Sequence, residues 1–193
     1  MENYFFDFLE QYMPLLEEEK KALIDLNIFR SFKKGTVLLK EGDTIKGGYF
    51  VIKGCLRSYY IIDGEEKTTA FFTESESLAP VFDANKSGSA HFVSCVEDSI
   101  ITVGNPEMGK EVIEKFPRFK KLCLIVSERL LAKNLASFAD FKNSSPEQRY
   151  LNLLKNRPDL FQRVPQHQIA SFLGMKPQSL SRIRKRLAQK GNV

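Results

Sequence analysis

Two periodicities of apolar and polar positions divide the chain. Between residues 2 and 30, apolar residues recur at helical spacing, and Pro14 separates two helical pieces. From Ser31 onward, short runs rich in β-branched and aromatic residues alternate with Gly and Asp; they include TVLL, YFVI, LRSYYII and TTAFF. Several short strands with regular turn signals predict an all-β sandwich, jelly roll or barrel.

The turns between these runs add two expectations. Asp63-Gly64 stands between YYII and EEKTTAFF, and both residues tolerate positive φ, so the pair predicts a hairpin. The runs HFVSCV and DSIITVG predict the last strands, which close the β region near Gly104. His91, in the first of these runs, is expected on a strand at the surface of the sandwich.

A helical pattern follows the β region. Asn105-Pro106 predicts a helix start, and Pro117 an interruption before a longer helix over residues 118–141. The apolar surface of this long helix is wider than one stripe, which predicts packing against two neighbours. One neighbour is the β region, and the other is the matching helix of a second subunit or, alternatively, the core of the same monomer. The polar stretch KNSSP, residues 142–146, predicts a hinge.

The stretch QHQIASFLGMKPQSLSRIRKRLAQK, residues 166–190, predicts two short helices joined by a sharp turn. Ala170 is small where a second helix must approach closely. Gly174 stands where the chain leaves the first helix and needs a left-handed φ. Pro177 suits the first position of the second helix. His167 lies on the first helix, where a surface or capping role is expected.

The second of these helices has two stripes on nearly opposite sides. Leu180, Ile183 and Leu187 form an apolar stripe, and the opposite one comprises Gln178, Arg182, Lys185 and Gln189. A recognition helix needs this arrangement, because one side anchors to the domain and the other presents hydrogen-bonding groups to base edges. An ordinary helical hairpin with a solvated basic face is the alternative.

Charge is distributed unevenly. The chain carries +5 overall, but residues 142–193 contain 11 Lys and Arg against 2 Asp and Glu, a net +9, which leaves −4 on the remainder. A basic terminal region is the expected electrostatic footprint of phosphate-backbone binding. The acidic start MENYFFDFLEQY lacks the layout of a signal peptide, and no apolar run approaches membrane-spanning length. The three scattered cysteines fit free structural thiols, so we expect a cytoplasmic protein without a membrane partner.

The helical pair resembles the helix-turn-helix of the Crp/Fnr family of bacterial transcription regulators. FKKGTVLLKEGD (Phe32–Asp43) and GGYFVIKGCLRSYY (Gly47–Tyr60) also resemble that family's cyclic nucleotide-binding-like domain. The resemblance implies an α+β fold with three parts: a double-stranded β-helix jelly roll over 1–115, a dimerisation helix over 116–141 and a helix-turn-helix domain over 142–193. It further implies a homodimer that binds a palindromic DNA operator and contacts RNA polymerase.

The resemblance also assigns DNA contacts. Arg182 matches the family's recurring arginine, which reads guanine through O6 and N7. Gln178 takes a place often held by glutamate, and glutamine pairs naturally with adenine. Lys176 replaces a common hydroxyl cap, so the cap is weaker and the lysine is a phosphate contact. The full set of expected DNA contacts is Lys176, Gln178, Ser179, Arg182, Arg184, Lys185 and Arg186.

The ligand pocket departs from that of family members that bind cyclic AMP. Their clamp uses a Gly-Glu turn and an Arg-Ser pair, whereas the candidate ligand residues here are Glu76, Ser77, Leu78, Ser89 and Ala90. Ser89-Ala90 takes the place of Arg-Ser, and NKSGSAHF contains no arginine; Lys86 is the one cation that could substitute. A buried phosphate without its cation is poorly compensated, so cyclic AMP is not the expected effector. Glu76 is then a polar turn residue.

Other chemistries find little support. Three scattered cysteines do not make an iron–sulfur site, and no catalytic dyad, phosphate-binding glycine loop or metal-ligand spacing is present. We therefore expect no enzyme, no metal and no resident cofactor, with the effector unknown. The competing hypothesis is a ligand-binding module whose basic tail contacts a protein or a membrane. The opposed stripes of residues 178–189 argue against it, because a membrane helix turns its apolar side chains outward.

Overall fold

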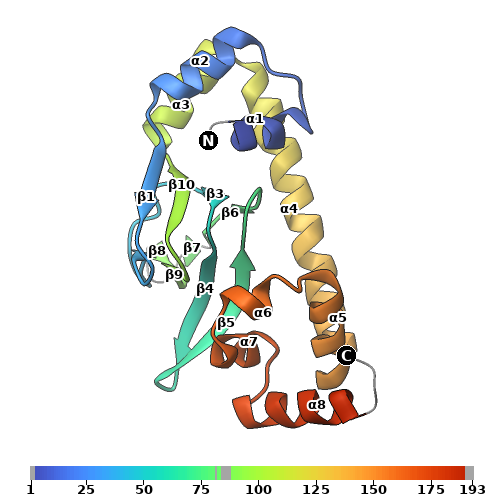
Figure 1. The fold of residues 1–193 in the computed structure, drawn as a ribbon. Helices are drawn as coiled ribbons and strands as arrows, with labels where there is room; N and C mark the ends of the chain where they lie inside the picture. Colours follow the sequence, from blue (N-terminus) through green and yellow to red (C-terminus); the bar gives the residue numbers. More distant parts are fainter. Residues whose placement is uncertain (1–2, 81, 84–87, 190–193) are drawn as a thin grey trace.

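The computed structural model describes residues 3–80, 82–83 and 88–189, which form a β domain, a long helix and a helical domain (Figure 1). Two helices come first, α1 (Asn3–Glu10) and α2 (Glu17–Asp25). The strands of the β domain are β1 (Phe29–Phe32), β2 (Val37–Leu39), β3 (Tyr49–Lys53), β4 (Leu56–Ile62), β5 (Glu65–Phe72), β6 (Ser77–Leu78), β7 (Phe82–Asp83), β8 (Gly88–Ser89), β9 (Phe92–Cys95) and β10 (Ser99–Val103). The remaining helices are α3 (Pro106–Lys115), α4 (Arg118–Asn143), α5 (Pro146–Asn156), α6 (Leu160–Arg163), α7 (Gln166–Phe172) and α8 (Pro177–Gln189).

The strands form two four-stranded antiparallel sheets with the orders β1-β10-β3-β6 and β2-β9-β4-β5, and β7 pairs with β8. This arrangement confirms the predicted α+β fold with a β jelly roll. The predicted hairpin joins β4 to β5, where Asp63 and Gly64 have φ of 53° and 76°. Both central residues of the turn are thus left-handed, which matches the twist of the flanking strands.

Strand β3 is buried on both faces. Because side chains alternate along a strand, its residues enter two different cores. Val51 packs between the sheets with Leu56, Val93 and Ile101, all fully buried. Phe50 and Ile52 point to the other face and pack under the helices, in a cluster that includes Phe6, Phe8, Leu9, Leu23, Val112, Phe119 and Leu122. The β domain therefore has one core between its sheets and a second core beneath α1–α4.

Helix α3 starts where Asn105-Pro106 predicts: the Asn105 side chain accepts a hydrogen bond of 2.8 Å from the Met108 amide. Helix α4 has 26 residues and is about 39 Å long at the standard rise. It continues two residues beyond the predicted end at 141. Only Ser144 and Ser145 separate it from α5, so the predicted hinge over 142–146 is shorter than expected. The Ser145 hydroxyl caps α5 by accepting from the Gln148 amide.

His91 does not lie on a strand surface as expected. Its side chain is buried, 3% exposed, and it precedes β9. The Ser89 hydroxyl donates to the His91 carbonyl at 2.7 Å, which turns the chain inward and places the imidazole against the Tyr60 ring. Burial lowers the pKa of His91 below its ordinary value.

The three cysteines are free, as expected. Burial raises the pKa of Cys55 to about 12 and that of Cys95 to about 11, so both thiols stay protonated near neutral pH. Within the described residues, no helix combines the length and the apolar character that a membrane span requires.

Candidate nucleic-acid interface

Helices α7 and α8 meet at an angle that is set by two small residues. Ala170 on α7 is fully buried where α8 approaches. Gly174 follows α7 with φ of +67°, and a Cβ at this position would lie 2.9 Å from Cζ of Phe141 on α4. The Met175 amide then donates to the Ala170 carbonyl at 2.9 Å. The turn expected at Gly174 is therefore present, and its left-handed backbone conformation favours glycine.

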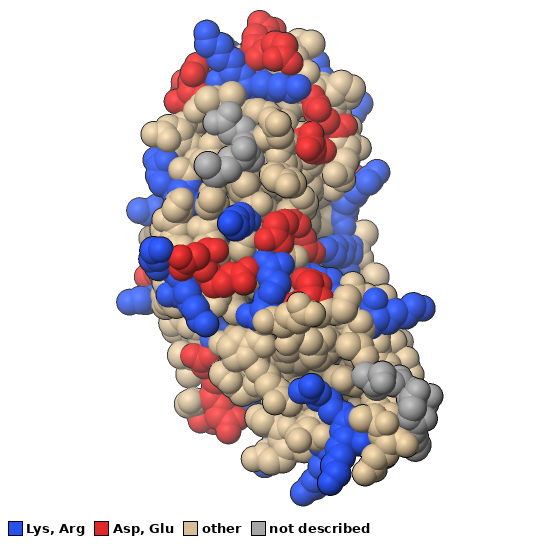
Figure 2. Space-filling model, viewed as in Figure 1, with Lys and Arg blue, Asp and Glu red and all other residues tan. Residues whose placement is uncertain are grey.

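Helix α8 buries one side and exposes the other. Leu180, Ile183 and Leu187 are buried in the core of the helical domain. All seven expected DNA contacts are exposed. Arg186 is paired with Glu147. Within the described residues no ion pair is formed by the other six, which are Lys176, Gln178, Ser179, Arg182, Arg184 and Lys185. Figure 2 shows basic side chains over the lower part of the molecule, where α8 lies in Figure 1.

Two of the expected DNA contacts have acidic neighbours. Arg186 forms an ion pair with Glu147 on α5, so its guanidinium is already bound within the domain. Lys176 lies near the tip of the β4–β5 hairpin: the pKa of Glu65 there is lowered, mainly by its hydrogen bond with Lys67 and to a lesser extent by the charge of Lys176. Sequence periodicity could not reveal either neighbour, because both come from other elements.

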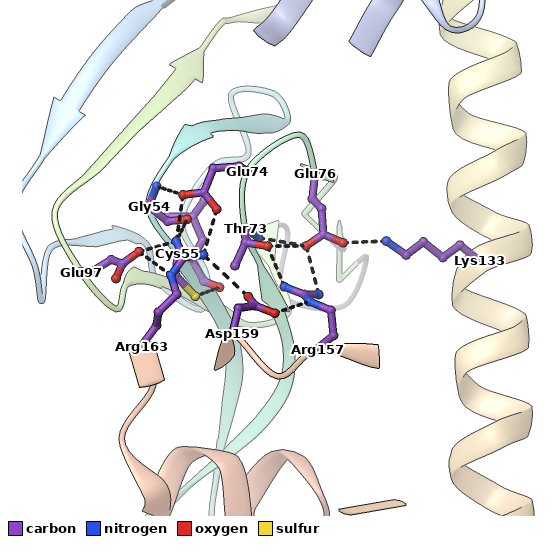
Figure 3. Close-up of polar contacts among 11 residues, drawn as sticks. Gly54, Cys55, Thr73, Glu74, Glu76, Glu97, Lys133, Arg157, Asp159 and Arg163 are labelled. Atoms are coloured by element: carbon purple, nitrogen blue, oxygen red, sulfur yellow. Dashed lines mark hydrogen bonds and ion pairs between the residues drawn. The ribbon is translucent and has the colours of Figure 1, made fainter. Parts of the chain in front are cut away.

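The helical domain is held against the β domain by Arg163, the last residue of α6 (Figure 3). Its two terminal nitrogens donate to the two carboxylate oxygens of Glu74, each at 2.9 Å. The same side chain donates to the Gly54 carbonyl at 2.9 Å, and its Nε donates to Glu97 at 3.0 Å. One arginine thus joins three separate loops of the β domain through a bidentate pair with Glu74 and three further hydrogen bonds, one to Gly54 and two to Glu97.

Glu76 is the second junction (Figure 3). Its carboxylate accepts a hydrogen bond of 2.7 Å from Lys133 on α4 and lies 3.3 Å from the guanidinium of Arg157, which follows α5. Arg157 also donates to the Thr73 hydroxyl at 2.7 Å. Burial alone would raise the pKa of Glu76, but the hydrogen bonds from Lys133 and the Thr73 amide and the charge of Arg157 outweigh it and lower the pKa. Glu76 therefore connects the β domain, α4 and the helical domain.

We refer to Gly54, Glu74, Glu76, Glu97, Lys133, Arg157 and Arg163 as the interdomain cluster. Sequence reasoning missed all of its members except Glu76. The groups that are paired across the domains lie 57 to 109 residues apart in the chain, and no local pattern marks such a pairing.

The five candidate ligand residues do not line one cavity. Glu76 is part of the interdomain cluster, whereas Ser77 and Leu78 line a cavity beneath the N-terminal helices. Ser89 is fully buried, and its hydroxyl is bound to the backbone of His91. Lys86, the cation considered as a substitute, lies outside the described residues. In the described part of the chain, no group of three or more His, Cys, Asp or Glu side chains is placed to hold a metal ion.

Comparisons with known proteins identify the β domain and the overall fold. Residues 29–107 match the family described as the cyclic nucleotide-binding domain. No curated protein sequence matches the chain.

Three solved structures resemble most of the chain. The c-di-GMP responsive global regulator CLP of Xanthomonas campestris has a TM-score of 0.70 at 16% identity, over 90% of this chain and 92% of that one. FixK2 of Bradyrhizobium japonicum has a TM-score of 0.64 at 16% identity, over 84% of this chain and 85% of that one. A CooA mutant of Carboxydothermus hydrogenoformans has a TM-score of 0.63 at 19% identity, over 86% of this chain and 79% of that one. Residues 29–107 therefore match the cyclic nucleotide-binding domain, and the chain shares the fold of these three solved structures. This fold is the one that the sequence resemblance to the Crp/Fnr family implied.

Proposed function

We propose that this protein is a transcription regulator that binds double-stranded DNA through α8. The observation that carries the proposal is the two-sided character of this helix: its apolar stripe is buried, and the stripe of Gln178, Arg182 and Lys185 is exposed on the opposite side. Arginine and glutamine at these positions supply the bidentate groups that distinguish base pairs in the major groove. A membrane-binding tail would need an outward apolar face, which the described part of α8 lacks.

The DNA-binding unit is proposed to be a homodimer joined along α4. Leu124, Leu131, Leu135 and Phe138 are each 58–64% exposed, and their spacing of seven, four and three residues is that of a coiled-coil seam. A second α4 would cover these side chains. Two copies related by a twofold axis would present two α8 helices to the half-sites of a palindromic operator about 34 Å apart.

We further propose that the interdomain cluster couples the β domain to the position of α8. Beyond this cluster, buried polar atoms on β5 and α7 lack a hydrogen-bond partner in the described structure, among them Oγ1 of Thr68 and Oε1 of Gln168. Unpartnered polar atoms weaken an interface, and the ion pairs of Arg163 are partly exposed to solvent. These features suit a contact that opens and closes. RNA polymerase is the partner, and the cytoplasm the location, that such a function implies.

The first test separates base reading from phosphate contact. Arg182→Ala is expected to weaken binding to the preferred operator by about 1–3 kcal/mol and to relax the preference at one base pair of each half-site. Arg184→Ala, the matched control on the same helix, is expected to weaken all DNA equally and to flatten the salt dependence. Fluorescence anisotropy with selected and random DNA at several salt concentrations measures both effects. Equal losses on the two DNAs for Arg182→Ala would contradict its role as a base reader.

The second test concerns assembly. Sedimentation at micromolar concentration is expected to give twice 22.1 kDa for the natural chain. Leu131→Glu places a charge in the proposed seam and is expected to shift the equilibrium toward monomer, because an unpaired charge resists burial. Ala136→Glu, on the same helix but about 140° away from Leu131, is the control and is expected to leave the dimer intact. A natural chain that sediments as a monomer would refute the proposed dimer.

The third test concerns the interdomain cluster. Arg163→Gln is expected to lower the free energy of unfolding by about 1–2 kcal/mol at pH 7, discounted for the partial exposure of the pairs. The pKa of Glu74 is lowered from 4.5: its burial opposes this, but hydrogen bonds from Arg163 and the Gly54 amide prevail. A lowered pKa stabilises the fold above about pH 4.5 and ceases to do so as pH falls through the folded-state value. Urea unfolding should therefore show a difference at pH 7 that shrinks toward pH 3.

Arg186→Gln removes an arginine from a more exposed pair with Glu147 and serves as the control for this experiment. We expect a smaller loss from this variant, under about 1 kcal/mol. A loss for Arg163→Gln that stays constant between pH 7 and pH 3 would show that its carboxylate partners contribute nothing.

The fourth test concerns cyclic nucleotides. We propose that neither cyclic AMP nor cyclic GMP is the effector, because Ser89 is fully buried and its hydroxyl is committed to the His91 backbone. A guanidinium at this position would supply about 1.5–3 kcal/mol of phosphate binding, equivalent to roughly a tenfold to hundredfold in affinity. Isothermal titration up to millimolar nucleotide should give no saturable heat. Micromolar affinity that tightens operator binding would overturn the proposal.

A further inference from the structure

A cavity of about 460 Å³ lies beneath the N-terminal helices, between α1, α3, α4 and the sheet that contains β3. Its volume falls in the range of small-molecule sites in proteins. Of the five ligand residues expected from the sequence, only Ser77 and Leu78 reach it. It is separate from the interdomain cluster, none of whose members lines it.

The walls of this cavity carry no charge: none of the lining residues is Asp, Glu, Lys, Arg or His. Aromatic rings from two elements form one side, where Phe5 and Phe8 on α1 pack against Phe50 on β3 at centroid distances of 5.3 and 4.7 Å. A charged ligand would lose its hydration here without a counter-charge, at a large cost. An apolar ligand would exchange water for ring and aliphatic contacts, which favours binding.

Some of the polar groups in the walls already form hydrogen bonds within the protein. The Thr102 hydroxyl accepts from the Phe50 amide at 3.1 Å, and the Asn105 side chain caps α3. Ser77 on β6 and Ser127 on α4 have no side-chain hydrogen bond within the part of the chain that the structure describes. The walls therefore offer hydroxyls to one or two neutral polar groups of a ligand and nothing to an ion.

We infer that this cavity is a binding site for an uncharged, mainly apolar small molecule. Helix α4 supplies Leu122, Val126 and Leu130 to the wall, and on an adjoining face it carries the exposed Leu124 and Leu131. A molecule in the cavity touches the helix on which the proposed dimer depends. In this respect the inference rests on the proposed function, whereas binding itself does not.

The direct test uses the uncharged dye N-phenyl-1-naphthylamine with the full chain and no DNA. We expect saturable fluorescence enhancement at one dye per chain. Decan-1-ol is expected to displace the dye, and decanoate, with the same chain length and a negative charge, to do so at least about tenfold less well. Dye fluorescence that does not saturate, or equal displacement by the alcohol and the carboxylate, would overturn the inference.

Two variants locate the dye. Val126→Trp fills the cavity and Ser127→Asp adds a charge to its wall, and each is expected to weaken dye binding at least about tenfold. Lys121→Trp, at an exposed position of α4 outside the wall, is the matched control and is expected to bind as the natural chain does. Thermal unfolding by circular dichroism identifies a variant that fails to fold, and the other variant then decides. Undiminished binding by a folded variant refutes the site.

A second copy of the chain is the competing occupant of the cavity. If a second copy fills it, dye binding per chain falls as protein concentration rises through dimerisation, which overturns the inference.

Coupling to DNA binding is tested separately. Operator affinity is measured with and without decan-1-ol, and a change in the natural chain that Val126→Trp lacks supports coupling. Operator binding without dye binding would leave the proposed function standing and refute the cavity. Dye binding without operator binding would support the cavity and refute the proposed function.

Discussion

The placement of the helical domain against the β domain depends on polar contacts between them, foremost those of Arg163. The Arg163 side chain contacts three loops of the β domain, which are contributed by Gly54, Glu74 and Glu97. A guanidinium suits this task because its donors lie in a rigid plane and cannot lose their charge near neutral pH. Since these pairs are partly open to solvent, they position the helical domain without binding it irreversibly.

Helix α4 is the element that all parts of the molecule share. Its first turns are anchored by Phe119 and Leu122 in the core beneath the N-terminal helices. Further along, Lys133 contacts Glu76, and near its end Phe141 packs against Gly174 and the guanidinium of Arg149. A displacement of this helix would therefore change contacts at the apolar cavity, at the interdomain cluster and at the turn before α8.

The β domain matches a family named for cyclic nucleotides, yet the candidate ligand residues among its described residues are engaged in contacts within the protein. The Glu76 carboxylate is paired with Lys133 and Arg157, and the Ser89 hydroxyl is hydrogen-bonded to the His91 carbonyl. A cavity whose lining residues carry no charge lies instead on the helix-covered face of the sheet. The fold supplies a scaffold with several possible concavities, and the side chains decide which of them has the chemistry to accept a ligand.

Sequence alone determined the elements and the character of α8. The left-handed turn at Asp63-Gly64, the cap at Asn105, the glycine at 174 and the opposed stripes of α8 follow from interactions within a few residues, so local patterns specify them. Tertiary structure decided the rest: the burial of His91, the pairing of Arg186 with Glu147 and the conversion of Glu76 from a candidate ligand residue into a junction. These outcomes depend on groups that are brought together from distant parts of the chain. An ion pair requires only proximity and opposite charge. The local sequence around a charged residue therefore predicts neither which residue it pairs with nor the geometry of the pair.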